Sequence, residues 1–296
     1  MIGVSIQNLA FRENNKELLA QHDCFEEYIL SLKSKGVDSI EIRKLPRKIS
    51  EEDFDLINAS IEKIWLAGMQ ITIHGDLTGE KSGDTFLEIY PSMEYILKNF
   101  QKYQNKIVMT LHALQEPSKS TQKSQDELKE ETISMLEKWV KLVEEENIPV
   151  YFALENNRSK DKSIDPGNSC KVVTEMVQRV NSRHLGVCWD MGHLFSNLNE
   201  ERELSMTMGE LPSEDFLKRV IHTHIHALND DGRTHFPLTE EFKLPIDVYV
   251  KALQEQNYNG VYNLELSFDR FAKEAPVAEQ VFTSINRLKE LQTVDV

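Results

Sequence analysis

Short apolar segments recur along the chain, and longer segments with apolar residues at every third or fourth position separate them. The short segments are typical of buried or half-buried β-strands, and the longer ones of amphipathic α-helices. The pattern predicts eight strands, over residues 3–7, 39–43, 70–75, 106–112, 149–155, 184–190, 220–226 and 260–265. It predicts helices over residues 24–35, 51–67, 84–103, 124–146, 168–180, 198–205, 213–219, 246–256 and 275–292.

Local residues mark several of these helix boundaries. Gly36 and Gly68 directly follow two predicted helices, at the position where glycine often supplies a left-handed C-cap conformation. Ser124 and Glu127 have the spacing of a capping box at the start of the helix over 124–146. Some helix starts and stops are therefore encoded locally.

The order of the elements predicts the fold class. Strands that alternate with helices are expected to be parallel. Eight such units in 296 residues predict an α/β fold, the (β/α)8 TIM barrel, whose usual length is ~250 residues. We expect a single domain over residues 1–296, because we find no linker, repeat or low-complexity segment. The polar segments 115–126 and 229–244 are predicted to be long loops above the barrel mouth.

Ionisable residues lie at the carboxyl ends of six predicted strands. In a TIM barrel these ends form the face that carries the active site. Isolated buried carboxylates are energetically costly and need partners, so this repeated placement predicts a shared metal centre. The residues concerned are His74, His112, Glu155, Asp190, Glu265 and the alternating series His222, His224 and His226.

Alternation within two strands indicates which of these side chains face the barrel interior. Asp190 follows Gly186 and Cys188 on one face of its strand, and His193 lies just past the strand end, close enough to share a site. Glu265 alternates with two leucines and is therefore expected to face away from the helices.

The three alternating histidines lie at successive depths, so a metal ion can take only one or two of them. His224 is our first choice as a ligand and His226 the second, whereas His222 is expected to be a hydrogen-bonded core residue. His74 and His112 are each expected either to bind a further metal ion or to donate a hydrogen bond to a substrate.

Carboxylates combined with one imidazole suit a divalent ion such as Mn²⁺, Mg²⁺, Co²⁺ or Zn²⁺. Such an ion can bind adjacent oxygens of a hydroxy-ketone and polarise its carbonyl group. Glu155 and Glu265 belong to the fifth and eighth predicted strands and can face one another across the mouth. Together they are suited to remove a proton and to return it.

Composition narrows the choice of partners. The formal net charge of −15 comes from 34 basic and 49 acidic residues, which argues against a nucleic-acid partner. Three cysteines without a CxxC spacing indicate a reducing compartment rather than disulfides or a thiolate metal site. We see no signal-peptide pattern at the N-terminus and no apolar run of ~20 residues. We therefore expect a cytoplasmic protein without a membrane partner.

Five motifs, in this order, resemble those of the xylose isomerase-like TIM barrels. That superfamily contains sugar and sugar-phosphate isomerases and epimerases, inosose isomerases and dehydratases, and endonuclease IV. The motifs are Leu154-Glu155-Asn156-Asn157, Cys188-Trp189-Asp190-Met191-Gly192-His193, His224-Ile225-His226-Ala227-Leu228-Asn229-Asp230-Asp231-Gly232, His235-Phe236-Pro237-Leu238 and Leu264-Glu265.

The resemblance implies one divalent metal ion, with Glu155 and Glu265 serving as ligands and also as the acid/base pair. It implies that Glu155, Asp190, His224 and Glu265 are the metal ligands. We assign a second set of residues to substrate binding, namely His74, His112, His193, His226 and His235.

The sequence therefore predicts a metal-dependent isomerase or epimerase of a small polyol, ketose or inosose, phosphorylated or not. The alternative is an endonuclease IV-like, zinc-dependent phosphoesterase acting on abasic DNA, since the resemblance covers residues for its three zinc ions. That enzyme has an Asp-x-His pair where this chain has Arg233-Thr234-His235. A binding module without catalysis is a third option, against which the presence of both glutamates argues. The oligomeric state is open, with a homo-oligomer as one option.

Overall fold

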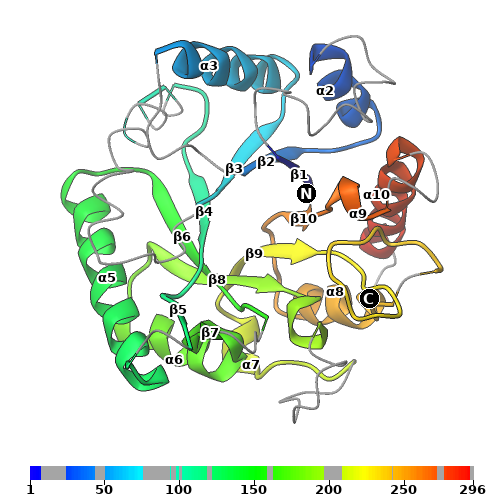
Figure 1. Ribbon diagram of the computed structural model, residues 1–296. Helices are drawn as coiled ribbons and strands as arrows, with labels where there is room; N and C mark the ends of the chain where they lie inside the picture. Colours follow the sequence, from blue (N-terminus) through cyan, green and yellow to red (C-terminus); the bar gives the residue numbers. More distant parts are fainter. Residues whose placement is uncertain are drawn as a thin grey trace.

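The computed structural model describes residues 1–7, 25–43, 51–75, 94, 98–99, 102–118, 122–158, 163–196, 209–241, 243–271 and 277–293, without the side chains of residues 51–54, 56 and 269. Eight parallel strands close into a barrel in the order β1-β10-β9-β8-β6-β4-β3-β2 (Figure 1). These strands are β1 (Ile2–Gln7), β2 (Ser39–Arg43), β3 (Gln70–His74), β4 (Ile107–Leu111), β6 (Val150–Glu155), β8 (Leu185–Asp190), β9 (Val220–Ile225) and β10 (Tyr262–Leu264).

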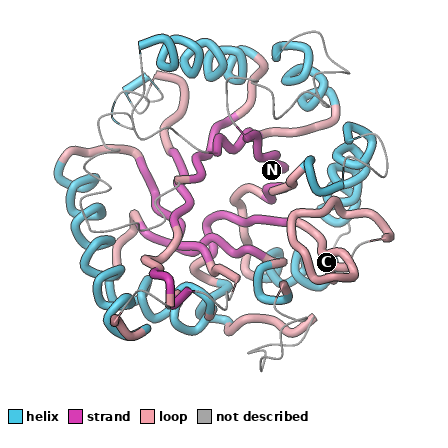
Figure 2. The backbone as a smooth tube through the Cα atoms, in the orientation of Figure 1, coloured by secondary structure: helices cyan, strands magenta, loops and turns pink. Residues whose placement is uncertain are grey.

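Helices surround the barrel, and Figure 2 shows them as an outer ring around the strands. The longer ones are α2 (Phe25–Ser34), α3 (Glu51–Leu66), α5 (Gln125–Glu145), α6 (Cys170–Val180), α8 (Ile246–Glu255) and α10 (Val277–Thr293). Short helical segments are η2 (Pro166–Asn168), η3 (His193–Phe195), α7 (Glu214–Leu217) and α9 (Phe268–Phe271). The predicted (β/α)8 TIM barrel is confirmed.

Two parts of the sequence prediction need comment. The helix predicted over 198–205 lies outside the described residues, as does most of the helix predicted over 84–103. The segment 115–126, predicted to be loop throughout, contains β5 (Glu116–Pro117), which pairs antiparallel with β7 (Ser163–Ile164). Each of these strands has only two residues, which is too short to produce a recognisable alternation.

The barrel strands pack one face against the helices and turn the other inward. Trp189 of β8 lies on the helix side, where its ring centroid is 6.2 Å from that of Phe216 and 5.2 Å from that of Tyr249. The neighbouring Asp190 points inward, and the register pairs it with His224 of β9. His224 pairs in turn with Asn263 of β10. This register brings polar side chains of adjacent strands together inside the barrel.

Candidate metal centre at the barrel mouth

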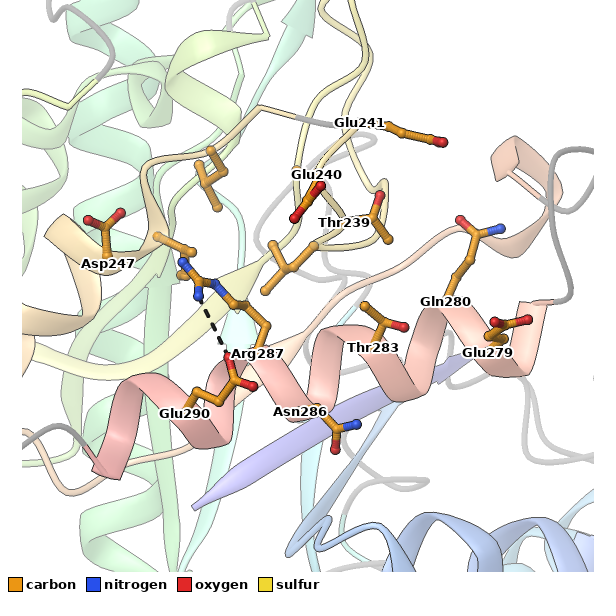
Figure 3. Close-up of a pocket in the computed structure, with 14 residues that line it drawn as sticks. Thr239, Glu240, Glu241, Asp247, Glu279, Gln280, Thr283, Asn286, Arg287 and Glu290 are labelled. Atoms are coloured by element: carbon orange, nitrogen blue, oxygen red, sulfur yellow. Dashed lines mark ion pairs between the residues drawn. The ribbon is translucent and has the colours of Figure 1, made fainter.

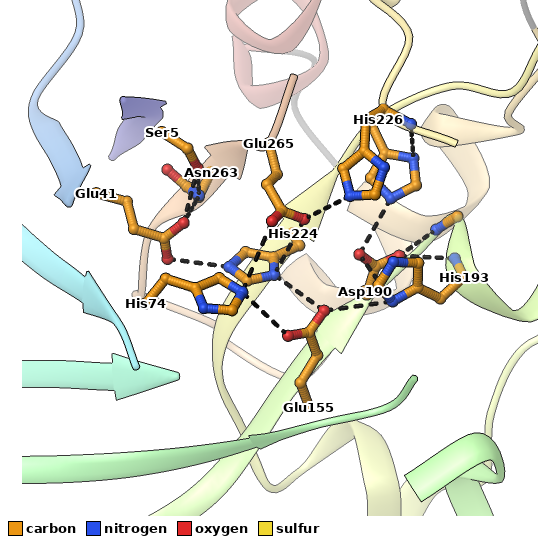
Figure 4. A network of polar contacts seen from close by, with 12 residues as sticks. Ser5, Glu41, His74, Glu155, Asp190, His193, His224, His226, Asn263 and Glu265 are labelled. Carbon is orange, nitrogen blue, oxygen red and sulfur yellow. Dashed lines mark hydrogen bonds and ion pairs between the residues drawn. The ribbon is translucent and has the colours of Figure 1, made fainter. Parts of the chain in front are cut away.

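Four side chains converge at the carboxyl ends of the strands. Glu155 ends β6, Asp190 ends β8, His224 lies one residue before the end of β9, and Glu265 follows β10. Each offers one potential ligand atom, and these atoms all lie within 4.8 Å of one another (Figure 4). All four residues are buried, with at most 1% of their surface exposed. The structure thus brings together the four residues predicted to bind a metal ion.

Three atoms at the centre of this group have unused hydrogen-bonding capacity. Glu155 Oε1, His224 Nδ1 and Glu265 Oε2 are buried and lack a hydrogen-bond partner among the described residues. The imidazole Nδ1 lies 3.1 Å from the Glu155 oxygen and 3.5 Å from the Glu265 oxygen. Buried polar atoms without partners are costly and call for an explanation. Three carboxylates and one imidazole form a donor set that fits a divalent cation.

The turn after β8 fixes the position of Asp190. Its Oδ1 accepts the backbone N–H groups of Gly192 at 2.9 Å and His193 at 2.7 Å. A side chain at position 192 would collide with the His226 ring, so this turn requires glycine. The Asn156 side chain completes the arrangement, since it donates to the backbone carbonyl of Asp190 at 2.8 Å and accepts its N–H at 2.9 Å. The sequence analysis assigned no role to Asn156.

The geometry favours His224 over His226 as the ligand. The backbone N–H of His235 donates to His226 Nδ1 at 3.0 Å. His226 Nε2 must therefore carry the hydrogen, which it donates to Asp190 Oδ2 at 3.0 Å. Both ring nitrogens of His226 are thus engaged, whereas His224 Nδ1 has no hydrogen-bond partner among the described residues and is directed at the two glutamates.

The histidines predicted to bind substrate surround the same carboxylates. His112 Nε2 lies 2.8 Å from Glu155 Oε2, and His193 Nδ1 lies 3.3 Å from Glu155 Oε1. His74 Nε2 lies 3.6 Å from Glu155 and 3.7 Å from Glu265. His235 Nε2 lies 3.2 Å from Glu265 Oε2. All five, including His226, therefore line one site, although their role in substrate binding stays a prediction.

Neighbouring charges keep the carboxyl groups ionised. Burial raises the pKa of Glu155, but the imidazoles of His224 and His112 outweigh burial and hold that pKa well below its usual range. Burial also raises the pKa of Glu265, but the Arg43 guanidinium and His224 hold it well below the usual range. The pKa of Asp190 is lowered in the same way, because His193 and His226 outweigh the effect of burial.

Two of the surrounding imidazoles are neutral at physiological pH. Burial, followed by the charge of Arg43, lowers the pKa of His74 to about 4. Burial is also the largest cause that lowers the pKa of His235, to about 3. Each ring can therefore donate one N–H while the other nitrogen accepts.

Two charged residues of β2 were expected on one face of their strand, but no role in the site was predicted for them. Arg43 Nη2 lies 2.7 Å from Glu265 Oε1, and Glu41 contacts His222 and His224. His222 is thus hydrogen-bonded in the core, as expected. The alternation of Glu41 and Arg43 with Ile40 and Ile42 is the pattern that indicates two charged side chains facing inward.

A separate cavity of about 870 Å³ lies between the loop after β9 and α10 (Figure 3). Five of its 14 lining residues are acidic, among them Glu240, Asp247 and Glu279. The Arg287 guanidinium there lies 3.7 Å from Glu290. None of the 14 residues drawn around it belongs to the candidate metal centre. The residues predicted to bind a metal ion therefore lie in the barrel mouth and not around this cavity.

The structure is a parallel TIM barrel with a carboxylate-rich candidate cation site at the carboxyl ends of its strands. The chain belongs to the xylose isomerase-like TIM barrel family, whose sequence model matches residues 30–291. Over 71 residues the chain is 39% identical to an uncharacterized protein of Methanocaldococcus jannaschii, a match that spans 23% of this chain and only 25% of that relative.

Several solved structures share the fold. A D-tagatose 3-epimerase-like protein has a TM-score of 0.65 at 17% identity, with 98% of this chain and 97% of that chain covered. The apo form of 3-keto-D-glucoside 4-epimerase from E. coli has a TM-score of 0.65 at 18% identity, with 98% and 100% covered. An IolI protein with a bound zinc atom has a TM-score of 0.60 at 16% identity, with 98% and 96% covered. In the part of the chain that the structure describes, no helix is long and apolar enough to cross a membrane.

Proposed function

We propose that the protein is a metal-dependent isomerase or epimerase of a small polyol, ketose or inosose, or of a phosphorylated derivative. The observation that carries the proposal is the convergence of three buried atoms that lack a hydrogen-bond partner among the described residues, Glu155 Oε1, His224 Nδ1 and Glu265 Oε2. Solved structures of the same fold include sugar epimerases and a protein with a bound zinc atom. The proposal therefore agrees with the chemistry found elsewhere on this fold.

A divalent ion such as Mn²⁺, Zn²⁺, Co²⁺ or Mg²⁺ would be held by Glu155, Asp190, His224 and Glu265. When bound, it would supply positive charge that polarises the substrate carbonyl and stabilises charge developing on the substrate oxygens. Asp190 is already fixed by two backbone N–H groups. The protein can therefore present this ligand without reorganising it.

The two glutamates carry the proton transfer. They lie on either side of His224 Nδ1, at 3.1 and 3.5 Å. One carboxylate removes the proton from the carbon next to the carbonyl, and the carboxylate on the other side first takes up a proton from a neighbouring acid and then returns it to the substrate. Arg43 keeps Glu265 ionised, whereas His112 is in contact with Glu155 and can exchange a proton with it. The neutral His74 and His235 are suited to donate N–H groups to substrate oxygens.

Replacing the glutamates tests this function. Glu155→Gln and Glu265→Gln are each expected to abolish turnover, because an amide cannot accept the transferred proton, and Glu265→Gln is also expected to weaken metal binding. The measurement is solvent deuterium uptake next to the carbonyl, followed by NMR across a panel of ketoses and inososes. Glu255→Gln on the exposed face of α8 serves as the matched control and retains activity. Full activity in both site variants would remove the proposal.

One observation favours the phosphoesterase as a second candidate. Further groups of potential ligands adjoin the first, one formed by Asp190, His193, His226 and His235 and another by His74, Glu155 and His224. Such groups are compatible with more than one metal ion. The exposed Arg233, however, stands where the nuclease has an aspartate, and the net charge of −15 opposes DNA binding.

The metal content separates the two candidates. We expect one tightly bound divalent ion per chain, measured by elemental mass spectrometry of the purified protein. Three zinc ions per chain, together with cleavage of a duplex containing an abasic site, would instead establish the phosphoesterase.

A further inference from the structure

A second buried polar cluster lies on the far side of His224 from the candidate cation. Glu41 of β2 forms its centre, with Ser5 of β1 and Asn263 of β10 beside it (Figure 4). His222 of β9 also contacts Glu41. These residues are at most 3% exposed, and Glu41 itself is fully buried. Among the described residues, this cluster contacts the candidate metal centre only through the His224 ring.

Hydrogen-bond counting shows that Glu41 acts only as an acceptor. Its Oε2 lies 2.9 Å from Nε2 of both His222 and His224. Its Oε1 accepts from the Ser5 hydroxyl at 2.7 Å and from Asn263 Nδ2 at 3.0 Å. The Ser5 hydroxyl itself accepts from Asn263 Nδ2 at 2.9 Å, so its single hydrogen is directed to Glu41. The two hydrogens directed at Oε1 leave no place for a proton there, and an ionised carboxylate can only accept at Oε2.

This arrangement determines the tautomer of His224. Because an ionised Glu41 can only accept, a His224 ring that gives its Nδ1 to a cation keeps its hydrogen on Nε2. His224 Nδ1 then carries a lone pair, and it is the nitrogen that faces Glu155 and Glu265 without a hydrogen-bond partner among the described residues. The opposite tautomer would direct a hydrogen at the cation and leave Glu41 Oε2 facing a bare nitrogen.

We propose that Glu41 is a positioning residue that fixes His224 in its Nε2–H tautomer and orients Nδ1 toward the cation. Ser5 and Asn263 hold Glu41 in the required orientation through its other oxygen. The inference rests on the proposed function, because it assumes that Glu155, Asp190, His224 and Glu265 bind a divalent ion. Carboxylate partners of this kind typically change metal affinity by 10- to 100-fold.

His222 offers an internal control. Its Nε2 contacts the same Glu41 oxygen at the same distance. Although Glu41, His222 and His224 are also close enough together to hold an ion, His222 is absent from the group of Glu155, Asp190, His224 and Glu265. Loss of His222 therefore disturbs the cluster and its packing without removing the acceptor on which the His224 tautomer depends.

The first test reads the tautomer directly, in zinc-loaded protein labelled with ¹⁵N-histidine. Long-range ¹H–¹⁵N NMR of the wild type is expected to show His224 with hydrogen on Nε2 and none on Nδ1. A His224 signal with the hydrogen on Nδ1 would overturn the inference, whatever the enzymatic activity. This measurement requires no variant, so it decides the question even if a Glu41 variant fails to fold.

The second test compares Glu41→Gln, His222→Gln and the surface control Glu255→Gln. Chelator competition with Mn²⁺ and Zn²⁺ is expected to show about 10- to 100-fold weaker binding for Glu41→Gln, and affinity within about threefold of wild type for the other two. Thermal unfolding without metal reports the structural effect separately. Wild-type affinity in Glu41→Gln, or equal losses in Glu41→Gln and His222→Gln, would overturn the inference. A wild type that binds these ions but turns over no sugar would instead contradict the proposed function alone.

Discussion

At the scale of single residues, the neighbours of each ionisable group decide its charge. Glu155 and Glu265 lie in similar burial but have different partners, imidazoles for the first and mainly the Arg43 guanidinium for the second. His74 and His235 are neutral because burial lowers their pKa values to about 4 and about 3. At neutral pH the barrel mouth therefore combines anionic oxygens with neutral N–H donors.

The low pKa of His74 predicts a dependence of stability on pH. In the unfolded chain an imidazole has a pKa of about 6.5, so between pH 6.5 and about 4 the unfolded chain binds more protons than the folded protein. The stability linked to His74 is therefore present above pH 6.5 and is lost as the pH falls toward 4. As the pH falls through this window, the free energy of unfolding is expected to decrease in the metal-free wild type more than in His74→Gln. The difference between the two decreases is expected to be on the order of 3 kcal/mol.

Urea unfolding at several pH values between 4 and 7, in the presence of a chelator, measures this difference. Gln70→Ala provides a control on the same strand, because Gln70 is exposed and does not titrate. Its pH dependence should match that of the wild type. The same slope for wild type and His74→Gln would show that His74 titrates normally in the folded protein.

At the scale of the elements, short local sequences mark several boundaries. Gly36 and Gly68 adopt φ angles of 81° and 71° just after α2 and α3, in the left-handed region that glycine tolerates. The capping box at the start of α5 is also present, with Ser124 Oγ accepting from the Glu127 backbone and Glu127 accepting from the Ser124 backbone. These features depend on a few adjacent residues and were predictable for that reason.

Removing the capping box tests its contribution. Ser124→Ala leaves a backbone N–H of the first turn without its acceptor, and we expect the free energy of unfolding to fall by about 1 kcal/mol. Ser134→Ala is the matched control, because Ser134 is exposed in the interior of the same helix and alanine is a good helix former. Denaturant unfolding of both variants is the measurement. An equal effect of the two substitutions would mean that the cap contributes nothing beyond helix propensity.

At the scale of the whole molecule, the position of the site was predictable but many of its contacts were not. Parallel strands deliver their carboxyl ends to one face of a barrel, so the meeting of Glu155, Asp190 and Glu265 follows from the order of the elements. The contact between Glu41 and His222 joins residues 181 positions apart. This contact depends on which strands face each other across the closed barrel and on how deep in the barrel each side chain lies. Hydrophobic periodicity along the sequence specifies neither.

The closure of the barrel between β1 and β10 has a consequence for biosynthesis. The bond between Ser5 and Asn263 joins residues separated by 258 positions, and both partners hold the acceptor of the His224 hydrogen. The ribosome synthesises Ser5 long before Asn263. A partly made chain that ends before Asn263 therefore contains the proposed ligands Glu155, Asp190 and His224, but not the bond between Ser5 and Asn263. We therefore expect competence for cation capture to arise late, when the last strand leaves the exit tunnel and the two ends of the sheet meet.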